Sequence, residues 1–148
     1  MSKVAIYLNF QGNTEEAFNA YKSIFGTEFS TPIMRLKDIP PNPSMPKLSE
    51  SDLNSVMHVA LPIIGDTELM GTDMLESMGH KLVIGNNTTI SLQLDSKEAA
   101  DRLYNALSEG GTDKEPMRDE FWGYWGCCLD KFGIRWMFNV MNQEQPTA

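Results

Sequence analysis

The two halves of this chain carry the same hydrophobic pattern, and this internal repeat constrains its fold more than any other feature. Residues 6–10 alternate with period two and are followed by a segment of period 3.6, and the same order returns from residue 90. The apolar helical positions are Ala17, Tyr21, Ile24 and Phe25 in the first half and Ala99, Leu103, Ala106 and Leu107 in the second. Each half therefore predicts a strand, a helix and then further strands. We expect an α+β fold built from a duplicated βαβββ unit.

This repeat predicts one domain over residues 1–148, with a first module over 1–75, a linker over 76–86 and a second module over 87–142. In the first module, Asn13 stands where an N-cap is expected, and Glu16 completes the spacing of a capping box. Residues 39–52 contain four prolines and show little periodicity, which is typical of a long surface loop. Loops of this length often cover sites, and the sequence leaves open whether this one does.

Composition excludes several classes of function. The formal net charge of −8 and the scattered basic residues argue against nucleic acid, whose phosphates require a basic surface. No apolar run approaches the roughly 20 residues that span a bilayer, and no basic segment leads into a signal-peptide core. A protein of the cytoplasm that does not enter a membrane is the expectation. Its hydrophobic content of 41% is sufficient for a folded core.

The cysteines and methionines give weaker signals. Cys127 and Cys128 are adjacent, so on a strand they point to opposite faces and do not readily form a disulfide with each other. A vicinal pair could bind a soft metal or sense oxidants, but it lacks the further ligands of a zinc site, and structural packing is the alternative. The ten methionines could line an adaptable pocket, although core packing explains most of them.

His58 is the candidate catalytic residue. It lies within a predicted strand and shares a face with Ala60 and Pro62. An imidazole titrates near neutral pH, so His58 could act as a general base or hydrogen-bond a ligand. The alternative is a partly buried histidine whose ring is satisfied by neighbouring backbone.

Three further polar residues are candidate ligand-binding residues. Asp73 ends a predicted strand and could anchor a substrate amine or pair with Arg135, whereas capping of the strand end is its structural alternative. Tyr7 and Asn9 face the same way on the first predicted strand. They could line a cleft together, or they could face water.

Trp122 and Trp136 belong to an aromatic cluster in the last predicted hairpin. Their indole rings could frame a flat apolar ligand, and their N–H groups could orient it. Core packing or a dimer interface is the alternative for either tryptophan. They complete the candidate ligand-binding set, which is Tyr7, Asn9, His58, Asp73, Trp122 and Trp136.

Several motifs, in order along the chain, resemble one known family. They are Tyr7-Leu8-Asn9-Phe10, Met57-His58-Val59-Ala60-Leu61, Leu69-Met70-Gly71-Thr72-Asp73, Phe121-Trp122-Gly123 and Asp130-Lys131-Phe132-Gly133-Ile134-Arg135-Trp136-Met137. The chain resembles the PhnB-like branch of the glyoxalase/bleomycin-resistance superfamily, also called vicinal oxygen chelate proteins. This resemblance implies two βαβββ modules whose curled antiparallel sheets form a cleft, usually in a homodimer.

Metal-dependent members of this superfamily place a His or Glu near the first and last strands of each module, and four such side chains hold a divalent ion. Alignment by resemblance puts the equivalent positions near Ala5, Met70, Thr89 and Met137. Alkyl and thioether side chains do not bind hard or borderline cations, and a threonine hydroxyl does so weakly. We therefore expect no metal and no cofactor, which disfavours the glyoxalase I reaction.

The leading hypothesis is a metal-free protein that binds a small, partly apolar molecule in its cleft. Two enzymatic alternatives stay open: a metal-dependent lyase, isomerase or dioxygenase with displaced ligands, and a metal-free isomerase with His58 as base. A scaffold whose cleft is filled by side chains is a third class. Proteins of this branch often carry a demethylubiquinone-methyltransferase label, but this sequence lacks the glycine-rich turn of a parallel βαβ unit that would hold an adenosyl cofactor.

Overall fold

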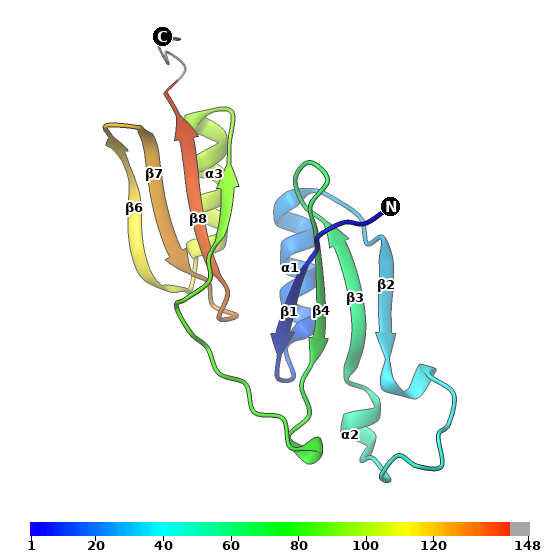
Figure 1. Ribbon diagram of the computed structural model, residues 1–148. Coiled ribbons are helices and arrows are strands. Elements are labelled where there is room, and N and C mark those ends of the chain that lie inside the picture. Colours follow the sequence, from blue (N-terminus) through cyan, green and yellow to red (C-terminus); the bar gives the residue numbers. More distant parts are fainter. Residues whose placement is uncertain (143–148) are drawn as a thin grey trace. The chain divides into compact units, whose positions relative to one another are not determined.

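The computed structural model describes residues 1–142 and divides the chain into two compact units, Met1–Val83 and a second that begins at Ile84 (Figure 1). The first unit contains β1 (Ile6–Phe10), α1 (Thr14–Phe25), β2 (Thr31–Arg35), the 3₁₀ turn η1 (Leu36–Asp38), α2 (Glu50–Leu53), β3 (Val56–Pro62), β4 (Glu68–Asp73) and the 3₁₀ turn η2 (Glu76–Met78). The second unit contains β5 (Ile90–Gln93), α3 (Lys97–Ser108), β6 (Thr112–Glu120), β7 (Gly123–Leu129) and β8 (Arg135–Met141).

Both units have the same topology, so the predicted α+β fold with two βαβββ units is confirmed. The strand order is β1-β4-β3-β2 in the first sheet and β5-β8-β7-β6 in the second. The register also repeats, since Ile6 lies opposite Leu69 in the first sheet and Ile90 lies opposite Trp136 in the second.

Each sheet is antiparallel except for one strand pair. β1 pairs with β4 in parallel, and β5 pairs with β8 in parallel. The cause is the helix that follows the first strand, which returns the chain to the end of the sheet where it started. The second strand then runs the same way as the first, the third runs back, and the fourth runs parallel to the first.

One face of the first sheet packs against α1, as Figure 1 shows. The buried side chains Leu8, Phe10, Val59, Leu61 and Leu69 point to this face and meet Ala17, Phe18 and Tyr21 of the helix. The contact is close at Gly71, where an added Cβ would lie 2.5 Å from Cε1 of Phe18. We call the opposite face, which carries no helix within the unit, the open face of the first sheet; it presents Tyr7, Asn9, His58, Ala60, Met70 and Thr72.

The second sheet packs against α3 in the same way. Leu92, Trp136 and Phe138 are buried toward Leu103, Tyr104 and Leu107 of the helix, and the rings of Tyr104 and Phe138 meet edge to face at 5.5 Å. Ser96 caps the start of α3, because its side chain accepts a hydrogen bond from the Ala99 amide at 3.1 Å. The open face of the second sheet, away from α3, presents Ser91, Gln93, Trp125, Cys127, Arg135, Met137 and Asn139.

The hydrophobic pattern of the sequence does not predict the position of β6. Its sequence, TDKEPMRDE, has charged residues and a proline in place of alternation. The topology explains this composition, because β6 is an edge strand with mostly exposed side chains. Charges and proline on an edge strand discourage pairing with another chain.

The proline-rich segment forms a surface loop between η1 and α2, as expected from its composition. Mostly apolar residues of this loop, with Leu36 and Leu53 at its ends, line a pocket of about 180 Å³ that is open to solvent. Among residues 1–142, no helix has the length and apolar content needed to cross a lipid bilayer.

Candidate functional site

The structure brings Tyr7 and His58 together on the open face of the first sheet. The Tyr7 hydroxyl lies 3.1 Å from Nδ1 of His58, and the two ring centroids are 5.7 Å apart. The strand order explains the contact, because β4 is the only strand between β1 and β3 and both side chains project to the same face. Tyr7 keeps 46% of its surface exposed, so the pair is accessible.

The surroundings of this pair are both polar and apolar. Burial raises the pKa of Tyr7 above its usual 10.0, and a hydrogen bond with Thr72 partly opposes that rise. Met70 lies directly opposite Tyr7 in the sheet. Asn9 lies two residues further along β1 on the same face and is exposed. Tyr7 and Asn9 therefore share one face, as alternation along the strand predicted, and the sheet register adds His58 to that face.

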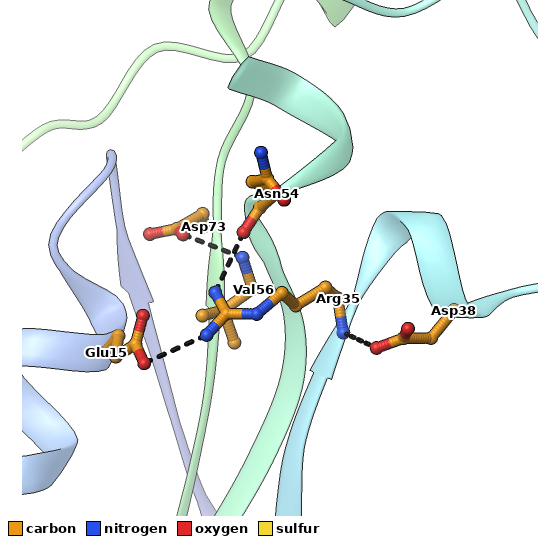
Figure 2. Close-up of polar contacts among 6 residues, drawn as sticks. All are labelled: Glu15, Arg35, Asp38, Asn54, Val56 and Asp73. Atoms are coloured by element: carbon orange, nitrogen blue, oxygen red, sulfur yellow. Dashed lines mark hydrogen bonds and ion pairs between the residues drawn. The ribbon is translucent and has the colours of Figure 1, made fainter. Parts of the chain in front are cut away.

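The Asp73 carboxylate is used in hydrogen bonds to other parts of the first unit (Figure 2). Its Oδ1 accepts hydrogen bonds from the Gly12 amide at 3.0 Å and from the amide and hydroxyl of Thr14 at 3.1 and 2.6 Å. Its Oδ2 accepts from the Val56 amide at 2.9 Å. Asp73 thus caps the start of α1 from the end of β4, and the capping box predicted at Asn13 was wrong, because the Asn13 side chain makes no cap hydrogen bond.

Arg35 closes the base of the proline-rich loop, as Figure 2 shows. Its Nη2 donates to Oε2 of Glu15 at 2.9 Å, its Nη1 donates to the Asn54 carbonyl at 3.0 Å, and its backbone amide donates to Asp38 at 2.9 Å. The Glu15 carboxylate raises the pKa of Arg35, which keeps the guanidinium charged. The arginine therefore ties both ends of the loop to α1.

Trp122 lies in the turn between β6 and β7 and begins a chain of side-chain hydrogen bonds. Its Nε1 donates to Oδ1 of Asn139 at 3.1 Å, Nδ2 of Asn139 donates to Gln93 at 3.0 Å, and Nε2 of Gln93 donates to Ser91 at 2.9 Å. The last three residues lie on the open face of the second sheet. Phe121 is 90% exposed and packs edge to face on Trp122 at 4.8 Å.

Sequence reasoning missed Asn139, Gln93 and Ser91. A signal for two of them was present, because Ser91 and Gln93 occupy in the second repeat the positions of Tyr7 and Asn9 in the first. Asn139 sits within an apolar strand, and only the register with Gln93 reveals its role.

Trp136 is not on this face. It is fully buried toward α3, and its Nε1 donates to Oδ2 of the buried Asp130 at 2.8 Å. The carboxylate of Asp130 also accepts the amides of Phe132 and Ile134, which fixes the turn before β8. Trp136 therefore contributes to the core, and the two tryptophans predicted to frame a ligand are not brought together.

The two cysteines point to opposite sides of β7, as expected for neighbours on a strand. Cys127 lies on the open face, and Cys128 is fully buried. Burial raises the pKa of the Cys127 thiol, and it raises that of Cys128 to about 12. Because the thiolate is the reactive form, neither cysteine is activated as a nucleophile or metal ligand.

The positions that resemblance equates with metal ligands do not fit a divalent cation. Met70 and Met137 occupy the same register position in their sheets, opposite Tyr7 and Ser91 respectively. Ala5 and Thr89 precede β1 and β5. Thioethers and a methyl group offer a divalent cation no hard donor. In the described part of the chain, no three His, Cys, Asp or Glu side chains gather where they could hold a metal ion.

Comparison with known proteins places this fold in a family. A family model described as 3-demethylubiquinone-9 3-methyltransferase matches residues 2–139. The PhnB protein of Bacillus cereus, which carries the same methyltransferase description, is 22% identical with a TM-score of 0.73, over 94% of this chain and 99% of that one. The chain belongs to the PhnB-like family.

Two further structures are similar to this chain. The PhnB-like chain is 31% identical to protein PA1353 from Pseudomonas aeruginosa, with a TM-score of 0.80 over 95% of this chain and 98% of that one. A glyoxalase/bleomycin-resistance/dioxygenase domain from Frankia is 13% identical, with a TM-score of 0.58 over 96% and 97% of the two chains, and shares the fold alone. The PhnB-like fold is therefore that of the glyoxalase/bleomycin-resistance superfamily.

Proposed function

We propose that this protein binds a small, partly aromatic or apolar molecule on the open faces of its sheets, without a metal ion. The observation that carries the proposal is the pair of Tyr7 and His58, an accessible aromatic hydroxyl joined to an imidazole at 3.1 Å. Such a pair offers both a flat apolar surface and hydrogen-bonding atoms, which is the usual composition of a small-molecule site. Asn9 on the same face adds a further donor and acceptor.

The second sheet supports the proposal with a similar mixture. Trp122 provides an aromatic surface, and its hydrogen bond to Asn139 fixes the indole. The network through Gln93 orders the amide groups beside it. Preorganised polar groups lower the entropy lost on binding.

The absence of a metal in this proposal rests on the donor set. Met70 and Met137 occupy equivalent positions in the two modules, and both carry soft thioethers. A metal-dependent lyase, isomerase or dioxygenase needs carboxylate or imidazole ligands in the site. The metal-dependent alternative would therefore require ligands from other positions.

A metal-free isomerase is the second candidate, and the geometry of His58 favours it over other enzyme classes. The contact with the Tyr7 hydroxyl can fix the orientation of the imidazole. In the tautomer that carries its proton on Nδ1, Nε2 can accept a proton from a bound substrate. The discriminating result is turnover: an isomerase loses it in His58→Gln, whereas a binding protein shows none.

A methyltransferase activity does not follow from the family's description. Adenosyl and dinucleotide cofactors bind at the carboxyl ends of parallel strands in open α/β sheets. Here parallel pairing is limited to β1 with β4 and β5 with β8. The homodimer and the cytoplasmic location expected from the sequence remain predictions.

The proposal is tested by titrating ¹⁵N-labelled protein with benzamide, a neutral aromatic amide. We expect the indole Nε1–H resonance of Trp122 to shift, while that of the buried Trp136 stays in place as an internal control. Trp122→Phe should weaken binding at the second sheet several-fold, and Tyr7→Phe should do the same for the resonance shifts of the first sheet. Equal perturbation of both indoles, or shifts confined to residues away from the open faces, would count against the proposal.

A further inference from the structure

Arg135 is a charged residue on the open face of the second sheet. It begins β8 opposite Leu129. Alternation along the strand puts Arg135 on the same face as Met137, with the buried Trp136 between them pointing to α3. The arginine therefore has apolar neighbours on the face that the proposed function assigns to a ligand.

One edge of the Arg135 guanidinium is formed by Nε and Nη2, and of these two groups only Nη2 has a hydrogen-bond partner among the described residues. Its Nη2 donates to Oδ2 of Asp113 at 3.2 Å, and the side chain keeps 18% of its surface exposed. Its Nε, which lies on the same edge, is buried and has no hydrogen-bond partner among the described residues. A buried N–H without an acceptor is costly, and two parallel N–H groups on one edge match the two oxygens of a carboxylate.

Asp113 binds the Arg135 guanidinium only weakly. Its side chain is 61% exposed, and it contacts Arg135 through one long hydrogen bond. Its backbone has φ of 50°, in the left-handed region, where pairing between β6 and β7 is irregular. Asp113 can therefore move away without disturbing the core.

Arg118, on the same sheet, provides a contrast. Its guanidinium binds Glu115 at 2.7 Å and Glu120 at 2.6 Å, and it lies 5.0 Å over the Trp125 ring. Its charge is compensated on two sides by carboxylates of its own strand. Arg135, by contrast, has a buried N–H with no partner among the described residues.

We propose that Arg135 binds the carboxylate of a small organic acid, which takes the place of Asp113 and accepts hydrogen bonds from both Nε and Nη2. This inference rests on the proposed function and narrows its ligand to a monocarboxylate with an apolar or aromatic body, because Leu129 and Met137 flank the arginine. In the absence of that acid, Asp113 accepts the hydrogen bond from Nη2 of Arg135. Because the net charge of −8 repels anions, a local cation such as Arg135 favours the binding of an acid.

The test compares benzoate with benzamide, which differ in charge but not in ring, and follows the Nε–H resonance of Arg135 in the ¹⁵N-labelled full chain. We expect millimolar benzoate to shift this resonance strongly and benzamide to leave it nearly unchanged. Arg135→Lys should weaken benzoate binding at least about tenfold, because a lysine cannot form the two parallel hydrogen bonds. Asp113→Asn, which tolerates the same backbone conformation, should strengthen it several-fold.

The matched control is Arg118→Lys, which should change benzoate affinity by less than about twofold, since its hydrogen bonds are already made. Thermal unfolding of each variant confirms that it is folded. Benzoate that leaves the Arg135 resonance unmoved, or that binds Arg135→Lys as well as the unaltered protein, overturns the inference while the proposed function stands. If benzoate moves Arg135 but benzamide moves no open-face residue, the inference stands and the proposed aromatic site fails.

Discussion

The hydroxyl of Thr14 donates to the carboxylate of Asp73 at 2.6 Å, which joins the start of α1 to the end of β4. The same carboxylate accepts the Val56 amide at the start of β3. One side chain thus holds three elements of the first unit in register. The start of α1 is therefore capped by a side chain from β4 and not by Asn13.

Removing this carboxylate should destabilise the protein markedly. Asp73→Ala leaves the amides of Thr14 and Val56 without their acceptor, and we expect a loss of about 3 kcal/mol in the free energy of unfolding. Urea denaturation followed by circular dichroism measures it. The control is Asp119→Ala, which breaks an exposed ion pair with Lys97 and should cost less than about 1 kcal/mol. Equal losses in both variants would refute the capping role.

The close approach of α1 to the first sheet requires glycine at position 71. Gly71→Ala would bring a Cβ to 2.5 Å from Phe18, so we expect a destabilisation of about 2 kcal/mol from overpacking. Gly85→Ala is the control, because the nearest atom to its Cβ would lie at 3.8 Å and its φ is ordinary. The same denaturation experiment applies. A stability of Gly71→Ala within error of Gly85→Ala would show that the helix can move away at no cost.

The tryptophans should separate into a core residue and a binding residue. Trp136→Phe removes the donor to buried Asp130, and we expect a loss of about 2 kcal/mol in stability. Trp122→Phe removes a partly exposed donor and should cost about 1 kcal/mol or less, yet weaken benzamide binding. Thermal unfolding and the benzamide titration give the two readouts. A larger loss of stability in Trp122→Phe, with weaker benzamide binding in Trp136→Phe, would contradict this assignment.

Trp122 and Trp136 also show which features of the structure could be predicted from the sequence and which could not. Its periodicity predicted both βαβββ units and the shared face of Tyr7 and Asn9, since alternation along one strand is enough to put two of its residues on the same face. It could not assign Trp136, because alternation alone does not say which face of β8 meets α3. It offered capping as the alternative for Asp73 but could not find the partners of Asp73, Asn139 and Arg135, which lie 17 or more residues away in sequence.

The pH dependence of Glu68 gives an electrostatic prediction. The hydrogen bond from Lys3, followed by one from Ser30, lowers the pKa of Glu68 below its usual 4.5. The stabilisation from this contact is therefore present above the pKa of the unfolded chain and is lost as the pH falls through the lowered folded value. In a ¹³C NMR titration, Lys3→Gln should return the pKa of Glu68 toward 4.5. An unchanged pKa would mean that Lys3 does not act on Glu68 in solution.

Met70 and Met137 occupy the positions that resemblance equates with metal ligands, and we propose that the protein binds its small molecule without a metal ion. Elemental analysis of protein purified without chelators or added metals tests this proposal. We expect nickel, zinc, manganese and iron far below one atom per chain. One atom of any of these metals per chain, retained through dialysis and bound by side chains of the open faces, would contradict it.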